Sequence, residues 1–379
     1  MTEAETTQAR EGHGGDLAVA VARAHGVDTM FTLSGAHVFP LYDGAVKADP
    51  PMRLVDVRHE PSAAFAAEAM GKLTRTPGLA VLTAGPGVTN AVSPIAQAHF
   101  NGSPMVVLGG RAPTHRWGTG SLQELDHPPI LSSITRLADT VHDVAQLADR
   151  VDDAFTVAAR SHRGPAFLDV PMDQLFSRTT VDLPAAPQRH REEPDPDSLA
   201  EIAALIGEAN LPVLVLGTDV WADHAEDAAR RLVETIGIPV VTNGMGRGIV
   251  PAGHPLLATK ARSVAFGQCD LAVVVGTPLD FRLGYGSFGG KEGTSSARVV
   301  HVADSAAGVS GHATLAASAH GDLSLTLDGL QAAFEQLLRR PDWSPWVDRL
   351  AQTAQAAAAK DKEILAADDD PIHPARVYG

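Results

Sequence analysis

The sequence predicts an α/β protein built of two doubly wound parallel-sheet domains and a helical connector. Short apolar runs rich in β-branched residues alternate with helix-forming stretches along most of the 379 residues, which is typical of parallel strands covered by helices on both faces. A proline-rich, charged segment at residues 183–198 divides this alternation in two, as an interdomain linker does. We therefore expect domains at residues 1–182 and 199–340, followed by a connector at residues 341–379.

The first candidate site residue, Glu60, stands where a predicted strand meets a predicted helix. Residues 54–57 form a β-branched run, and Pro61 suits the first turn of a helix because its missing N–H needs no partner there. Ligands bind at this edge of open α/β sheets, and the small apolar neighbours of Glu60 predict a poorly solvated carboxylate. Acidic residues also complement the helix dipole at helix N-termini, so position alone favours that role over catalysis.

A second strand–turn–helix unit follows along the chain. Residues 79–83 read as a buried strand, residues 84–87 as a tight turn around Gly-Pro-Gly, and residues 88–98 as a helix. By itself, Gly-Pro-Gly marks only a turn. The order of the two units carries more information than either motif.

That order resembles the pyrimidine-binding domain of thiamine-diphosphate enzymes, and most of all the acetolactate synthase (acetohydroxyacid synthase) group. Five stretches carry the resemblance, and their order and spacing make it specific. They are residues 31–43, 58–69, 83–90, 101–110 and 122–126. The second domain would then be the family's central, Rossmann-like domain.

The resemblance implies a reaction and roles for individual residues. The reaction is thiamine-diphosphate-dependent decarboxylation of pyruvate and addition to a second 2-keto acid, as in branched-chain amino acid biosynthesis. Glu60 would hold the proton on N1′ of the cofactor's aminopyrimidine, and Gln123 would be a polar group near the reacting carbons. The implied cofactor-binding positions are Ser34, Gly35, Ala36, His37, Glu60, Gly85, Pro86, Gly87 and Asn90.

Three departures from the family pattern leave the substrate open. Ser34-Gly35-Ala36 stands where the family often has Pro-Gly-Gly, His37 stands where a small residue is usual, and Leu122 replaces the usual Phe. These changes would alter the wall of the substrate pocket. A histidine at the start of a helix is more often bonded locally than used as a proton donor, so we expect a local partner for His37.

The second domain offers a candidate nucleotide site. Strands are expected at residues 212–216, 239–241, 271–275 and 298–302, while a Gly-x-Gly-x-x-Gly fingerprint is missing. Candidate contacts after these strands are Gly217, Gly276 and Asp304.

The identity of a nucleotide stays open at the sequence level. Resemblance to acetolactate synthases implies FAD in this domain. Residues 244–248, 261–263 and 280–286 also resemble oxalyl-CoA decarboxylase and 2-hydroxyacyl-CoA lyase, which place an ADP-like group there. The remaining alternative is a structural α/β layer with an empty site.

The resemblance places the metal outside this sequence. Residues 371–379 resemble the opening of the family's third domain, which supplies the Mg²⁺ ligands for the cofactor's diphosphate, and residues 368–370 read as a solvated acidic turn. We therefore expect no metal ligand here and weak binding of thiamine diphosphate by the chain alone. The chain is interpreted as a truncated enzyme, working as a homo-oligomer with active sites shared between subunits, or as a subunit that pairs with a separate diphosphate-binding chain.

Composition narrows the function classes. A net charge of −15 argues against nucleic acid or an anionic membrane as partner. The single cysteine, Cys269, excludes an internal disulfide framework, and its apolar setting predicts a buried structural thiol. A polar start without a signal peptide, and no apolar run of the roughly 20 residues that span a membrane, predict a cytoplasmic protein.

Overall fold

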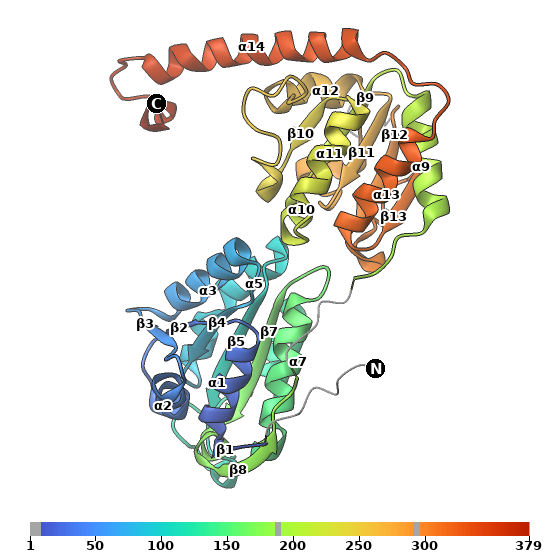
Figure 1. The fold of residues 1–379 in the computed structure, drawn as a ribbon. Helices are drawn as coiled ribbons and strands as arrows, with labels where there is room; N and C mark the ends of the chain where they lie inside the picture. The colour runs from blue at the N-terminus through green and yellow to red at the C-terminus, as the bar shows by residue number, and fades with distance from the viewer. Residues whose placement is uncertain (1–8, 186–190, 291–295, 379) are drawn as a thin grey trace. The chain divides into compact units, whose positions relative to one another are not determined.

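The computed structural model describes residues 9–185, 191–290 and 296–378. The chain forms two compact units whose boundary falls between residues 189 and 190 (Figure 1). Residues 186–190, in the middle of the predicted linker, and residues 1–8 of the polar start lie outside the described residues. Just after this gap, the Glu192 carbonyl accepts a hydrogen bond from the Asp322 N–H, so the end of the predicted linker packs on the second unit.

The first unit is built on a six-stranded parallel sheet. Its strand order is β3 (Arg53–Asp56), β2 (Thr29–Thr32), β4 (Gly78–Leu82), β5 (Met105–Arg111), β7 (Pro165–Pro171) and β6 (Leu137–Thr140). An antiparallel ribbon of β1 (Ala9–His13) and β8 (Arg178–Asp182) lies beside it. The helices and short turns are α1 (Gly14–Ala24), η1 (Ala36–Val38), α2 (Phe39–Lys47), α3 (Glu60–Thr74), α4 (Pro86–Asn90), α5 (Val92–Asn101), η2 (Thr114–Arg116), α6 (Pro128–Leu131), η3 (Ser132–Ile134), η4 (Val144–Gln146), α7 (Leu147–Ala159) and α8 (Met172–Phe176).

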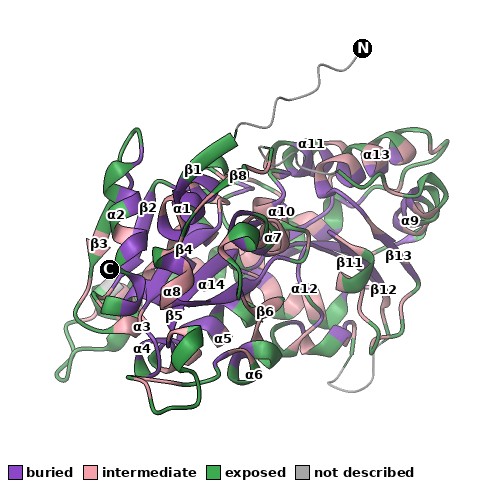
Figure 2. Cartoon of the chain, turned by 90° about the horizontal axis from the view of Figure 1, so that it is seen from below, coloured by how far each residue is buried: buried purple, intermediate pink, exposed green. Residues whose placement is uncertain are grey.

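Alternate residues of these strands face two different cores, as the period of two in a strand requires. Met30, Val81 and Leu108 pack with α1, α2 and α7 on one face. Phe31 and Val107 pack with α3, α4 and α5 on the other. Figure 2 shows the central strands β2, β4 and β5 in purple, the colour of buried residues, whereas the edge strands β3 and β6 contain exposed or intermediate residues. The doubly wound prediction is confirmed for this unit.

The second unit repeats the architecture with a five-stranded parallel sheet. The strand order is β10 (Val240–Thr242), β9 (Pro212–Leu216), β11 (Leu271–Val275), β12 (Arg298–Ala303) and β13 (Ala317–His320). The helices and short turns are α9 (Pro196–Glu208), α10 (Thr218–Ala222), α11 (Glu226–Ile236), η5 (Gly244–Gly246), η6 (Thr259–Ala261), α12 (Arg262–Gln268), η7 (Phe281–Gly286), η8 (Ala306–Gly308), α13 (Leu323–Glu335), α14 (Ser344–Ala366) and η9 (Pro374–Tyr378). Helices α9, α11 and α13 cover one face, while α12 and the start of α14 cover the other.

Two tryptophans fix the start of α14, the predicted helical connector, to the second unit. The indole N–H groups of Trp343 and Trp346 donate to the carbonyls of Ala209 and Pro212 at 2.9 and 3.0 Å. Both rings are buried, which is the usual way a large amphipathic side chain satisfies its donor. None of the helices in the described ranges is at once long and apolar enough to pass through a membrane.

Cys269 is the buried thiol that the sequence predicts. It lies just before β11, with Sγ 3.6 Å from the Phe266 carbonyl oxygen. Burial, helped by the charge of Asp270, raises the pKa of the Cys269 thiol from 9.0 to about 12. The thiolate, which is the reactive form, is therefore scarce in the folded chain at neutral pH.

We expect Cys269 to resist alkylation by iodoacetamide at pH 8 in the folded chain and to react readily in urea. Because the folded pKa lies above the unfolded one, the contribution to stability is complete below pH 9.0 and is lost as the pH rises toward 12. Mass spectrometry of the labelled chain measures the first effect, and Cys269→Ala gives the unlabelled baseline. Equal labelling rates in the folded and unfolded chain would contradict the burial of this thiol.

Candidate functional site

The predicted site residues of the first unit gather at one edge of its sheet. Strands β3, β2, β4 and β5 are all parallel, so their carboxyl ends lie side by side. Glu60 follows β3, Gly35 follows β2, Gly85 follows β4, and Gln123 lies in the long loop after β5. Parallel pairing thus collects at one edge segments that are far apart in the sequence.

Glu60 is joined to Asn90 across this edge. Glu60 is the first residue of α3, behind the extended N-cap residue His59, and Asn90 Nδ2 donates a hydrogen bond to Glu60 Oε2 at 2.9 Å. The structure therefore brings together two residues that the resemblance assigned separately. Glu60 has intermediate burial and its contact with Asn90 is exposed, so the expectation of a poorly solvated carboxylate is not met in this chain.

A break in the helix frees Asn90 for this contact. The sequence predicts one helix over residues 88–98, but the structure has α4 ending at Asn90 and α5 beginning at Val92. Pro94 explains the break, because it has no N–H to donate to the carbonyl of residue 90 and its ring would clash with that carbonyl in a continuous helix. Regular bonding resumes with Ile95 N–H donating to the Ala91 carbonyl at 3.0 Å.

The Gly85 turn requires glycine for two reasons. Its backbone has φ 58° and ψ −118°, a conformation that residues with a Cβ avoid. A Cβ at Gly85 would also lie 2.9 Å from the Cβ of Gln123. The Gly85 carbonyl accepts from the N–H groups of Val88 and Thr89 and so starts α4. The turn therefore connects the Gln123 loop to the helix that carries Asn90.

His37 makes different contacts from those predicted. It is buried, and its Nδ1 lies 3.0 Å from Oγ1 of Thr83, a residue just after β4. Burial lowers the pKa of His37, a hydrogen bond with the backbone of Leu122 partly offsets this, and His127 lowers it further. The predicted local partner is wrong because the η1 turn directs the ring toward the neighbouring strand end. The neighbouring residues Ser34 and Ala36 are exposed.

A buried group of charged and polar residues that was not identified from the sequence lies behind the Gly85 turn. His127 Nε2 lies 2.9 Å from the Gly85 nitrogen, and His127 Nδ1 lies 3.1 Å from Asp169 Oδ2. Arg111 Nη1 donates to the same Asp169 oxygen at 2.5 Å and to Asp126 Oδ1 at 2.9 Å. The one available signal was Asp169 itself, a charged residue inside the buried strand β7.

The candidate nucleotide residues of the second unit also lie at the carboxyl edge of their sheet. Gly217 follows β9, Gly276 follows β11, and the buried Asp304 follows β12. A Cβ on Gly217 would lie 2.3 Å from the Thr277 Cβ, and one on Gly276 would lie 2.9 Å from the Val220 nitrogen. The chain's own packing therefore explains both glycines without a ligand.

Arg247 and Arg262 lie near enough to each other for their charges to interact. Burial, and secondly the charge of Arg247, lowers the pKa of Arg262. No ion pair joins either arginine to a carboxylate in the described part of the chain. Arg262 instead donates to the carbonyl of Arg282 and lies over the Phe266 ring. Uncompensated cations of this kind favour an anionic ligand.

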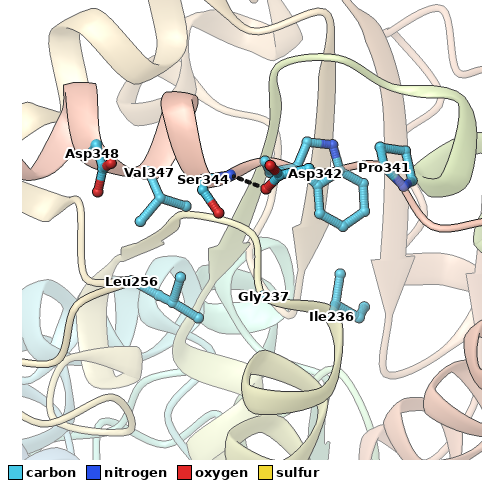
Figure 3. A pocket seen from close by; sticks show the side chains of 9 residues that line it. Ile236, Gly237, Leu256, Pro341, Asp342, Ser344, Val347 and Asp348 are labelled. Carbon is cyan, nitrogen blue, oxygen red and sulfur yellow. Dashed lines mark hydrogen bonds between the residues drawn. The ribbon is translucent and has the colours of Figure 1, made fainter.

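Two other features lie away from these edges. A hollow of about 310 Å³ lies between the end of α11 and the start of α14, and Figure 3 shows the side chains that line it. Its carboxylates, Asp342 and Asp348, would repel a phosphate, and it contains none of the predicted site residues. In the first unit, His13 and Asp16 form a capping box at the start of α1, and Lys47 pairs with the nearby Asp43. Helix capping accounts for that group.

Two family models match the chain. The model described as thiamine pyrophosphate enzyme, N-terminal TPP binding domain, matches residues 12–130. The model described as thiamine pyrophosphate enzyme, central domain, matches residues 199–330.

Several relatives are similar over most of the chain. The probable acetolactate synthase of Mycobacterium bovis and the acetolactate synthase large subunit IlvG of Mycobacterium tuberculosis are each 44% identical over 383 residues, which cover 99% of this chain and 67% of theirs. The 2-hydroxyacyl-CoA lyase 2 of Homo sapiens is 33% identical over 311 residues, which cover 72% of this chain and 49% of the lyase.

The two constraints on Gly85 can be measured. Gly85→Ala should lower the free energy of unfolding of the first unit by about 2–4 kcal/mol, because it combines backbone strain with a steric clash. Gly118→Ala is the matched control: Gly118 also has a positive φ, but a Cβ added there would meet no atom within 4 Å, and about 1 kcal/mol is expected. Both losses of unfolding free energy can be measured by urea unfolding, with hydrogen exchange of peptides from the first unit as the probe of that unit. Equal losses would mean that the Gln123 contact has no energetic weight.

Proposed function

The chain belongs to the thiamine pyrophosphate enzyme family, and we propose that it carries the aminopyrimidine side of an acetolactate synthase-like active site. The reaction would decarboxylate pyruvate and join the product to a second 2-keto acid. The observation that carries the proposal is the Glu60–Asn90 pair at the carboxyl edge of the first sheet. The identity of 44% to two acetolactate synthases, over 99% of the chain, supports the same reaction.

The residues at this edge fit an aminopyrimidine. Asn90 occupies Glu60 Oε2, while Oε1 accepts no hydrogen bond from the residues that the structure describes. That leaves one carboxylate oxygen, on a partly exposed side chain, to hold a proton at N1′ of the ring. When bound, thiamine diphosphate supplies the electron sink for decarboxylation.

The other residues of the edge would orient the substrate. Gln123 lies against Gly85 through its Cβ and backbone atoms, and we propose that its side-chain amide is the polar group near the reacting carbons. His37, whose lowered pKa keeps it neutral at pH 7, would be a hydrogen-bonding part of the wall and not a charged one. Leu122, which is exposed, would add an apolar surface to the pocket.

An apolar surface favours a shared active site. Phe65 and Leu73 on α3 and Phe100 at the end of α5 are exposed, the last two by 62% and 76%. Exposed apolar side chains grouped on neighbouring helices mark association surfaces. We propose that a second subunit, or a separate diphosphate-binding chain, covers them and provides the Mg²⁺ and diphosphate side of the site.

We further propose a nucleotide, FAD or ADP, at the edge of the second sheet. Asp304 stands where a carboxylate bonds a ribose hydroxyl in related folds, and the uncompensated Arg262 and Arg247 suit a pyrophosphate. The glycines of this edge give no support, since packing explains them. The absorbance spectrum of nucleotide that co-purifies with the chain distinguishes FAD from ADP.

The role of Glu60 is open to a direct test. In the catalytically complete protein, Glu60→Gln should lower kcat by roughly 100- to 10,000-fold, because an amide cannot exchange a proton with N1′. Steady-state kinetics with saturating thiamine diphosphate and Mg²⁺ measures this. Glu68→Gln is the control in the same helix: Glu68 accepts from Ser103 and Asn101 through one oxygen, an acceptor that glutamine retains. Comparable activity of a folded Glu60→Gln protein and the wild type would remove Glu60 from the mechanism.

A comparison of substrates separates the two candidate chemistries. The alternative, an oxalyl-CoA decarboxylase or 2-hydroxyacyl-CoA lyase reaction, is supported by the 33% identity to a 2-hydroxyacyl-CoA lyase. An acetolactate synthase should convert pyruvate alone into acetolactate, detected as acetoin after acid treatment. A CoA-dependent lyase should ignore pyruvate and cleave an acyl-CoA. Activity on oxalyl-CoA or a 2-hydroxyacyl-CoA, with none on pyruvate, would replace the preferred function by the alternative.

A further inference from the structure

The buried charged residues behind the Gly85 turn have no role in the chemistry assigned so far. His127 is 1% exposed, Asp169 is 0% exposed, and Arg111 is 7% exposed. Charged and polar groups are costly to bury unless they are paired. Asp169 Oδ1 even remains without a hydrogen-bond partner among the described residues. A cluster that is expensive to bury and lies next to a catalytic edge calls for a functional explanation.

The geometry fixes the protonation pattern of His127. The Gly85 backbone N–H can only donate, so His127 Nε2 must be the acceptor of the 2.9 Å bond. The proton of the neutral ring is therefore on Nδ1, which donates to Asp169 Oδ2 at 3.1 Å. Arg111 donates to the same carboxylate oxygen. Arg111 thus holds the Asp169 carboxylate in place, and that carboxylate orients the His127 ring.

The connections continue from Gly85 to Glu60. The Gly85 N–H is taken by His127, and its carbonyl accepts the first hydrogen bonds of α4. Helix α4 is only five residues long and ends at Asn90, which donates to Glu60. A rotation of the Gly85 peptide would therefore displace α4, and with it the amide that orients the Glu60 carboxylate.

Arg111 also connects the same cluster to the Gln123 loop. Its guanidinium donates to Asp126, at the end of residues 122–126, and lies 3.8 Å from the ring centre of Trp117 in that loop. Gln123 in turn packs against Gly85. The cluster thus contacts both segments that the proposed function places beside the cofactor ring.

We propose that His127 is a positioning residue for the Glu60 site: oriented by Asp169 and Arg111, it fixes the Gly85 peptide and thereby the register of Asn90 on Glu60. The inference rests on the proposed function for its catalytic consequence. Histidine suits this place because one rigid ring presents an acceptor to Gly85 and a donor to Asp169. Asparagine can replace only the donor at the Nδ1 position, and glutamine can replace only the acceptor at the Nε2 position.

These two substitutions provide the test. In the protein assembled with the diphosphate side of its site, His127→Asn should lower kcat by about tenfold or more. Losing the hydrogen bond from the Gly85 N–H corresponds to about a tenfold change in rate. The KM for the keto acid should stay within about twofold, because His127 touches no substrate. His127→Gln, which keeps an acceptor for Gly85, should stay within about threefold of the wild-type kcat. Hydrogen exchange of peptides covering residues 84–90 should speed up in His127→Asn and not in His127→Gln.

A control variant separates positioning from stability. His25 is another histidine of the first unit; its side chain is 3% exposed, is bonded to Asp152 at 2.7 Å and is stacked on Phe155. His25→Asn should lower the melting temperature as His127→Asn does, yet retain kcat. If His127→Asn and His127→Gln have the same kcat, or if exchange at residues 84–90 does not distinguish them, the proposal is overturned.

The exchange measurement also keeps this proposal distinct from the proposed function. A wild-type protein without thiamine-diphosphate-dependent turnover on pyruvate or an acyl-CoA would refute the proposed function. The exchange rates would then decide by themselves whether His127 holds the Gly85 peptide: faster exchange in His127→Asn alone supports it, and equal rates refute it.

Discussion

The backbone of Gly85 is the constraint on which the rest of the site depends. Its N–H is bonded to His127, its carbonyl starts α4, and its Cα leaves no room for a side chain beside Gln123. Each contact involves a different segment of the chain. Because the φ and ψ values are those of glycine alone, the peptide has few ways to relax. The positions of the groups at the exposed edge of the sheet therefore depend, through this turn, on the positions of the buried charged residues.

Much of this arrangement was predictable from local sequence, and the reasons are physical. Strand β3 follows from a β-branched run and β4 from a short apolar run. The edge position of Glu60 and Gly85 follows from the alternation of strands and helices. The single helix predicted over residues 88–98 was wrong at this point, although Pro94 forbids a continuous helix and marks where α4 has to end. Strand β13, by contrast, is short, lies at the sheet edge and has the sequence Ala-Ser-Ala-His, which carries almost no strand signal.

Contacts between distant segments could not be predicted in the same way. His37 bonds to Thr83, and His127 bonds to Gly85 and Asp169, yet no local pattern joins these positions. The sequence does show that Asp169 interrupts an apolar strand, and a buried carboxylate needs partners. It does not show which of the 30 lysines and arginines or 16 histidines provide them. The parallel pairing of β5 and β7 brings Arg111, at the end of β5, close to Asp169. His127 comes from the segment after β5, at the start of α6, and only the fold brings it to the same carboxylate.

The place of Glu60 along the edge is set at the far end of its own helix. Helix α3 buries Ala63, Ala64 and Ala67 against the sheet, and small residues let a helix approach closely. A Cβ on Gly71 would lie 2.0 Å from the Pro104 carbonyl oxygen, and one on Gly78 would lie 1.9 Å from the Ala67 carbonyl oxygen. A helix held this tightly cannot slide without steric overlap. The position of the Glu60 carboxylate is thus set by backbone packing around Gly71, more than two helical turns away. The Gly85 turn then determines whether Asn90 lies within hydrogen-bond distance of that carboxylate.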